Sequence, residues 1–107
     1  MSDMRAVSPP TLNDALAAEL RMARALAGIP IKQLASELSL GRFTVQRIFK
    51  GEKEITAGEL IKLADAMRVD LGELISKARD RARNEAERAA EAKAAHDAQL
   101  LREIQNL

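Results

Sequence analysis

Closely spaced helix start and stop signals constrain the fold of this 107-residue chain more than any other sequence feature. A Thr or Asp followed three positions later by an acidic residue is typical of a helix N-terminus, and proline suits the first helical position because it lacks an N–H group. Glycine is typical of the position directly after a helix. The start signals are Thr11 with Asp14, Pro30, Thr56 with Glu59, and Asp70 with Glu73, and the stop signals are Gly28 and Gly51. Together with the turn Ser39-Leu40-Gly41, after which a further helix starts at about Arg42, they predict five short helices between residues 11 and 76.

Apolar residues recur every three or four positions between these signals, which is the spacing of a helix with one buried face. Abundant Ala, Leu, Glu, Arg and Lys, with few β-branched runs, favour an all-α fold for residues 11–76. The predicted buried faces are Leu12, Leu16, Leu20, Ala23 and Ala27; Ile31, Leu34, Ala35 and Leu38; Val45, Ile48 and Phe49; Leu60, Ile61, Leu63, Ala64 and Met67; and Leu71, Leu74 and Ile75.

The composition changes after Ser76. Residues 77–107 contain no Gly or Pro, many alanines, and opposite charges at helical spacing, which predicts a solvated C-terminal helical extension. A helix over residues 71–107 would be about 55 Å long, too long for the domain to cover along its whole length. At the other end, residues 1–10 finish with two prolines and are expected to form a mobile N-terminal arm.

The large apolar residues of the extension gather near its end and have three interpretations: a dimer or partner contact, a fold back onto the domain, or a frayed end. The alanine-rich stretch before them has no sustained heptad of large residues, so a long coiled coil is only weakly specified. These residues are Leu100, Leu101, Ile104 and Leu107. The basic run at the start of the extension is interpreted as a solvated helix face, with phosphate contact as the alternative. It consists of Lys77, Arg79, Arg81 and Arg83.

Composition excludes several kinds of site. Without cysteine the chain has no disulfide, thiolate metal site or cysteine nucleophile. The single histidine, His96, makes a histidine-built zinc site unexpected and is interpreted as an exposed helical residue. No apolar run resembles a secretion signal or a membrane span, so a cytoplasmic protein without membrane contact is expected. No acid–base pair, phosphate loop or metal cluster is visible, so no enzyme activity, cofactor or small-molecule ligand is expected.

The segment 31–50 has the pattern of two helices that meet steeply across a short turn. Ala35 supplies the small residue that such a contact needs, and the turn contains Gly41. In the second helix, burial of Val45, Ile48 and Phe49 leaves one exposed stripe. Exposure is favoured for Phe43 as well, because the alternative, its burial in the core, would rotate its neighbours outward. The stripe holds Arg42, Phe43, Gln46, Arg47 and Lys50.

Residues 20–75 resemble the lambda-repressor-like (Cro-type) helix-turn-helix family. The resemblance is carried by the stretches ITAGELIKLADAMRV and DLGELI and, in the segment above, by Leu34-Ala35, Leu40, Arg42, Thr44-Val45, Arg47-Ile48 and Gly51. The chain departs from the family pattern at three positions. Pro30 stands where the family usually has a Ser or Thr cap, Ile31 stands where it has a phosphate-binding Gln, and Ser39 stands where it has the turn Gly.

The resemblance implies that the helix 42–50 enters the major groove of double-stranded DNA. Arg suits guanine, Gln suits adenine, and an apolar side chain suits the thymine methyl group. The implied base contacts are Arg42, Phe43, Arg47 and the further candidate Gln46. The implied phosphate contacts are Thr44 and Lys50, with Lys32 or a backbone N–H group in place of the missing Gln, and Lys53 from the same basic stretch. Residues 42–53 hold four basic residues against Glu52 alone, although the whole chain carries only +1.

The expected function is that of a sequence-specific transcription regulator, a phage or bacterial repressor. Because palindromic operators require two-fold dimers, self-association through the C-terminal helix is favoured, with a monomer as the alternative. The rival hypothesis is an antitoxin-type or other protein-interaction module whose C-terminal helix binds a partner. Arg5 in the N-terminal arm is interpreted as an ordinary surface residue rather than as a minor-groove contact.

Overall fold

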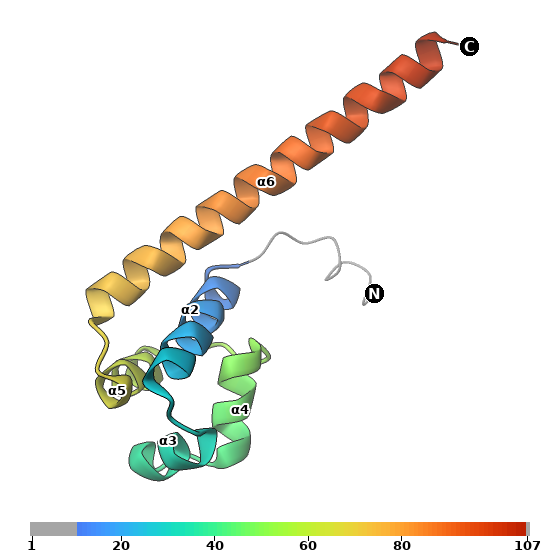
Figure 1. The fold of residues 1–107 in the computed structure, drawn as a ribbon. Helices are drawn as coiled ribbons and strands as arrows, with labels where there is room; N and C mark the ends of the chain where they lie inside the picture. The colour runs from blue at the N-terminus through green and yellow to red at the C-terminus, as the bar shows by residue number, and fades with distance from the viewer. Residues whose placement is uncertain (1–10, 107) are drawn as a thin grey trace.

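The computed structural model describes residues 11–106, and these residues form helices and no strand (Figure 1). The predicted all-α fold is therefore confirmed. The expected N-terminal arm, Arg5 within it, and Leu107 lie outside the described residues. The helices are α2 (Leu12–Ala27), α3 (Ile31–Leu38), α4 (Arg42–Lys50), α5 (Ala57–Met67) and α6 (Leu71–Gln105).

Both predicted threonine caps form. The Thr11 hydroxyl accepts a hydrogen bond from the Asp14 N–H group at 3.1 Å, and the Thr11 N–H group donates to the Asp14 carboxylate at 3.0 Å. Thr56 and Glu59 make the same reciprocal pair at the start of α5. Two otherwise unpaired backbone groups are satisfied at each helix start, which explains why these local sequence signals predict the boundaries well.

The third predicted cap is only half formed. The Asp70 carboxylate accepts from the Glu73 N–H group at 2.8 Å, but no return bond from Glu73 reaches the cap residue. The Glu73 carboxylate instead lies 3.1 Å from the Lys77 ammonium group, one turn further along the helix. The start of α3 also differs by one position from the prediction, because Pro30 is the cap residue before the helix and Ile31 is the first helical residue.

The core lies where α2, α3, α4 and α5 meet, with the first turns of α6 completing it. Its largest fully buried side chains are Leu20, Leu34, Val45, Ile48 and Leu63. The buried face predicted for α2 is partly wrong, because Leu12 and Ala27 are exposed while Ala15 and Ala17 are buried. This helix contacts α4, α5 and α6, so it buries small residues on more than one side. Ile61 of α5, also predicted to be buried, is 47% exposed.

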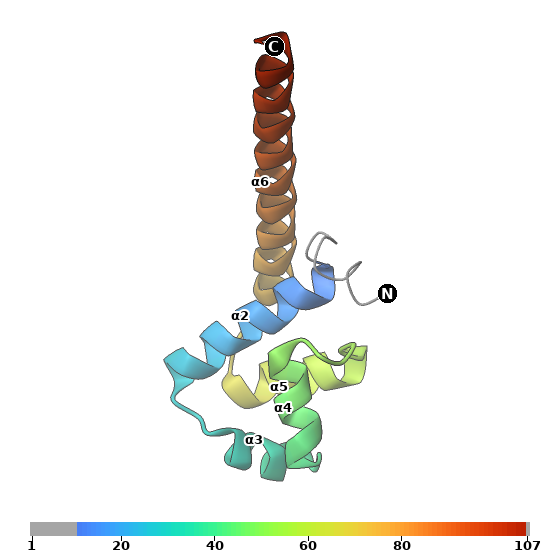
Figure 2. The same cartoon turned by 90° about the vertical axis from the view of Figure 1, so that its right-hand side faces the viewer.

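The last helix is unbroken and projects from the domain (Figure 2). It passes through residues 76 and 77, where the domain was expected to give way to the extension, without a break. The molecule is 64 Å long because of this helix, and the helix side chains of residues 86–105 are exposed. Within residues 11–106 the helix does not fold back onto the domain. None of the helices in this range has the length and apolar character needed to cross a membrane.

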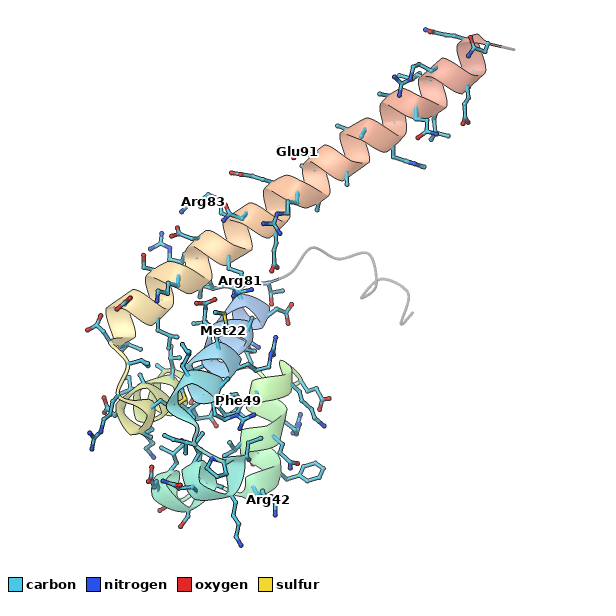
Figure 3. The ribbon with its side chains drawn as sticks, in the orientation of Figure 1. Met22, Arg42, Phe49, Arg81, Arg83 and Glu91 are labelled. Atoms are coloured by element: carbon cyan, nitrogen blue, oxygen red, sulfur yellow. The ribbon has the colours of Figure 1, made fainter. Side chains whose placement is uncertain are left out.

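An ion pair attaches α6 to α2. The Arg81 guanidinium contacts the Glu19 carboxylate through Nε at 2.7 Å and through Nη2 at 2.6 Å. Glu19 is buried, with 9% of the residue exposed. Arg81 also donates a hydrogen bond to the Met22 sulfur. The interpretation of the basic run as one solvated face is therefore wrong for Arg81. Residues two positions apart point to opposite sides of a helix, so Arg81 faces α2 whereas Arg83 points away from it (Figure 3).

Candidate nucleic-acid interface

The helices α3 and α4 pack across a tight turn. Leu34 and Leu38 of α3 and Val45 and Ile48 of α4 are buried together in the core. The Leu40 N–H group donates to the Ala35 carbonyl at 3.1 Å, which closes the end of α3. This arrangement fixes α4 by its apolar side and leaves its other side at the surface.

The exposed side of α4 carries the residues that were predicted to contact bases. Phe43 is 77% exposed, which favours the exposed interpretation of this residue over burial in the core. Arg42 and Arg47 are exposed on the same helix, and Gln46 is half-buried beside them. Arg42 lies at the end of α4 farthest from α6 (Figure 3). The structure therefore brings all four candidate base-contact residues to the outer side of one helix.

The candidate phosphate contacts differ in their surroundings. Lys32 at the start of α3 and Lys50 at the end of α4 are exposed, and Thr44 is half-buried. No side chain caps the start of α3, so the N–H groups of Ile31 and Lys32 lack the usual side-chain partner, whereas the Gln33 N–H group donates to the Pro30 carbonyl at 3.1 Å. Such groups suit an anion, and here they lie beside Lys32. Ile31, which stands where the family pattern has a phosphate-binding Gln, packs its side chain against the core.

Lys53 is half-buried, and its side chain is held in an ion pair. Its ammonium group lies 2.8 Å from the Glu59 carboxylate and 3.0 Å from the Glu54 carbonyl oxygen. Burial alone would raise the pKa of Glu59, but hydrogen bonds from Lys53 and from Thr56 outweigh it and leave the pKa below its usual value. Contact of Lys53 with a phosphate therefore requires this ion pair to open.

Three residues of α2 support α4 from behind, and sequence reasoning did not find them. Arg21 Nη1 donates to the carbonyl of Phe49, close to the C-terminal end of α4 where positive charge is favourable. The Arg24 guanidinium lies 5.5 Å from the centre of the Phe49 ring. Asn13 binds the loop after α4 through hydrogen bonds to Lys53 and Ile55. No periodic pattern marks these residues, because their partners are far away in the sequence.

A basic, exposed helix held across a short turn by a second helix defines the class of helix-turn-helix DNA-binding proteins. A family model described as Helix-turn-helix matches residues 20–74. The chain belongs to this lambda-repressor-like (Cro-type) helix-turn-helix family.

Two crystal structures of the clp gene regulator ClgR from Corynebacterium glutamicum are similar to the chain. One has a TM-score of 0.69 at 25% identity and covers 83% of this chain and 92% of that chain. The other has a TM-score of 0.63 at 25% identity and covers 66% of this chain and 92% of that chain. The first structure covers 83% of this chain, which is more residues than the stretch 1–85 contains. The similarity therefore extends into the projecting part of α6. No curated protein matches the chain.

Proposed function

We propose that this protein is a DNA-binding transcription regulator that represses bacterial or phage promoters by occluding them. The observation that carries the proposal is the two-sided α4, whose apolar side is buried while Arg42, Phe43 and Arg47 are exposed. The family assignment and the similarity to ClgR, a gene regulator by its description, support the same function.

Each exposed side chain has a role in this proposal. Arg42 and Arg47 bind guanine edges, Gln46 binds adenine, and Phe43 rests on a thymine methyl group. Lys32, Thr44 and Lys50 contact phosphates and set the position of α4 in the groove, and Lys53 joins them when it leaves Glu59. No small-molecule ligand takes part, so the protein's own concentration or a protein partner controls repression.

The protein acts as a homodimer in this proposal, because a two-fold dimer matches a palindromic operator. The contact involves the end of α6, where Leu100, Leu101 and Ile104 are 44%, 60% and 63% exposed. Leu107, outside the described residues, belongs to the same proposed contact. The same exposed end supports the second candidate function, an antitoxin-type module in which α6 binds a different protein.

Selection of binding sites from random duplexes tests the DNA-binding function. We expect Arg47→Ala to weaken binding to the selected site by about 1–3 kcal/mol and to relax specificity at one base pair. Lys50→Ala should weaken binding to all duplexes about equally and make it less sensitive to salt. Titrations at several salt concentrations measure both effects.

Arg88→Ala is the matched control, because Arg88 is an exposed arginine on the projecting part of α6. It should leave DNA affinity unchanged. If the selection enriches no sequence, or if the Arg47 and Lys50 variants both bind as tightly as the parent, α4 is not the reading helix. Stable binding of a different protein to α6 without operator binding would favour the antitoxin-type alternative.

A further inference from the structure

One stripe of the projecting part of α6 has the spacing of a coiled-coil seam. Positions 86, 90, 93, 97, 100 and 104 follow one another at alternating intervals of four and three residues, so their side chains share one side of the helix. Every side chain from residue 86 to residue 105 is exposed. The stripe is therefore free to meet another helix.

The residues on this stripe are unevenly distributed. Small side chains come first, at Ala86 and Ala90, and large ones last, at Leu100 and Ile104. Opposite charges occupy the middle, with Lys93 followed by Asp97. A parallel, in-register pairing of two copies would set Lys93 against Lys93 and Asp97 against Asp97, and it would pair alanine with alanine. Both charge contacts would be repulsive.

We propose that α6 pairs with α6 of a second copy in the antiparallel orientation. In the proposed register, each residue of the stripe faces the residue of the other copy whose number adds up with its own to 190. Lys93 of each copy then faces Asp97 of the other, and two ion pairs form at the centre. Ala90 faces Leu100, and Ala86 faces Ile104, so each large side chain meets a small one. This register deepens the proposed self-association and rests on it, but it does not depend on DNA binding.

The attachment of α6 to its own domain is compatible with this register. The last side chains of α6 that are half-buried are those of Arg81, Ala82 and Glu85. The paired region begins beyond them, at residue 86. The two domains therefore lie at opposite ends of the helix pair and do not collide.

Charge exchange tests the register. Lys93→Asp sets its new carboxylate against Asp97 of the other copy, and Asp97→Lys sets its new ammonium group against Lys93 of the other copy. Each change should raise the dimer dissociation constant about tenfold or more, because two symmetric ion pairs become repulsive contacts. The double variant restores opposite charges across the antiparallel pair and should return the constant to near the parent value. Sedimentation equilibrium of the full chain measures the three constants.

Glu91→Lys is the matched control, because Glu91 is exposed and is not one of the stripe positions. It changes the net charge as Asp97→Lys does and should leave dimerisation unchanged. Circular dichroism checks that all variants keep their helix content. In a parallel pair the double variant would remain repulsive, so failure of the double variant to recover would overturn the orientation.

Distances between spin labels give an independent test. The chain has no cysteine, so Ser76→Cys provides one labelling site per copy at the base of α6. The antiparallel register separates the two labels by about 55 Å along the helix axis, whereas a parallel pair holds them within about 20 Å.

The outcomes separate this inference from the proposed function. A chain that stays monomeric at all concentrations yet selects a DNA site overturns the helix pairing and leaves the DNA-binding function intact. An antiparallel dimer that selects no DNA site does the reverse. Labels held side by side would disprove the antiparallel orientation whether or not DNA binds.

Discussion

At the residue scale, Asn13 ties the loop after α4 to the start of α2. Its Nδ2 group donates to the Lys53 carbonyl at 3.0 Å, and its Oδ1 atom accepts from the Ile55 N–H group at 2.9 Å. Both bonds are partly buried, so the loss of the amide leaves a backbone donor and a backbone acceptor without partners. An asparagine is needed here because its side chain donates and accepts at once.

We expect Asn13→Ala to lower the free energy of unfolding by about 2 kcal/mol, because both backbone groups of the loop lose their partner. Asn13→Asp keeps the acceptor but loses the donor, so it should be intermediate in cost or equally harmful. Urea denaturation measures both variants. Gln33→Ala removes an exposed bond to Glu37 and serves as the control, with a change of less than about 0.5 kcal/mol. Equal stability of Asn13→Ala and the parent would disprove the role of this side chain.

Single residues also show where sequence reasoning succeeds. The absence of the usual turn glycine at Ser39 was visible in the sequence, and the structure holds Ser39 in the left-handed region at φ 53°. Asn13 was not predictable, because its partners lie 40 and 42 positions away and no local rule connects them. The same holds for Arg21 and Arg24, whose contacts with Phe49 depend on the tertiary packing of α2 against α4.

At the scale of the helices, boundaries were predictable where capping is local. The threonine caps of α2 and α5 need only residues within one turn, and the uninterrupted α6 follows from the absence of Gly and Pro after Gly72. The buried side of α2 was not predictable, because a periodic pattern identifies one stripe whereas this helix contacts neighbours on more than one side. The exposed stripe of α4 was predictable because α4 has one buried side.

The start of α5 gives a pH dependence. The pKa of Glu59 lies below its usual value of 4.5 in the folded protein, so its ionised form stabilises the fold. This contribution is complete above the unfolded-state pKa and disappears as the pH falls through the lower folded-state pKa. Glu59→Gln should therefore lower the free energy of unfolding at pH 7 by about 1 kcal/mol and by progressively less below pH 4.5.

Urea denaturation of Glu59→Gln and the parent at several pH values between about 3 and 7 measures this difference. Glu54→Gln, a change at an exposed neighbour in the sequence, is the control and should have almost no effect at any pH. A Glu59→Gln penalty that grows as the pH falls would contradict the assigned ion pair with Lys53.

At the scale of the whole molecule, a small domain carries a helix much longer than the domain can cover. The contacts that join them end near Arg81, which pairs with the buried Glu19, and Ala78, which is fully buried. Each part is near neutral by itself, because acidic residues elsewhere in the domain offset the basic residues of α4 and the long helix carries equal numbers of basic and acidic residues. Modest, salt-sensitive affinity for unspecific DNA is expected as a result.

We expect a chain that ends at Arg88 to keep the stability of the parent within about 0.5 kcal/mol at concentrations where both are monomers, because residues 89–106, the described part of the removed segment, are all exposed. Arg81→Met, by contrast, leaves Glu19 without its partner and should cost about 2–3 kcal/mol. Thermal and urea unfolding of dilute protein measure both. A large loss of stability on truncation would show that the outer part of α6 contributes to the folding of the domain.

The projecting helix also determines how quickly its own amide hydrogens exchange with solvent. Residues 86–105 are all exposed in the part of the chain that the structure describes, and an isolated helix opens readily from its free end. Amides in this segment of a single copy should therefore exchange many times faster than those of α4 or α5, although all are hydrogen-bonded. If two copies pair through α6, the protection of these amides should rise with protein concentration while that of the domain stays constant.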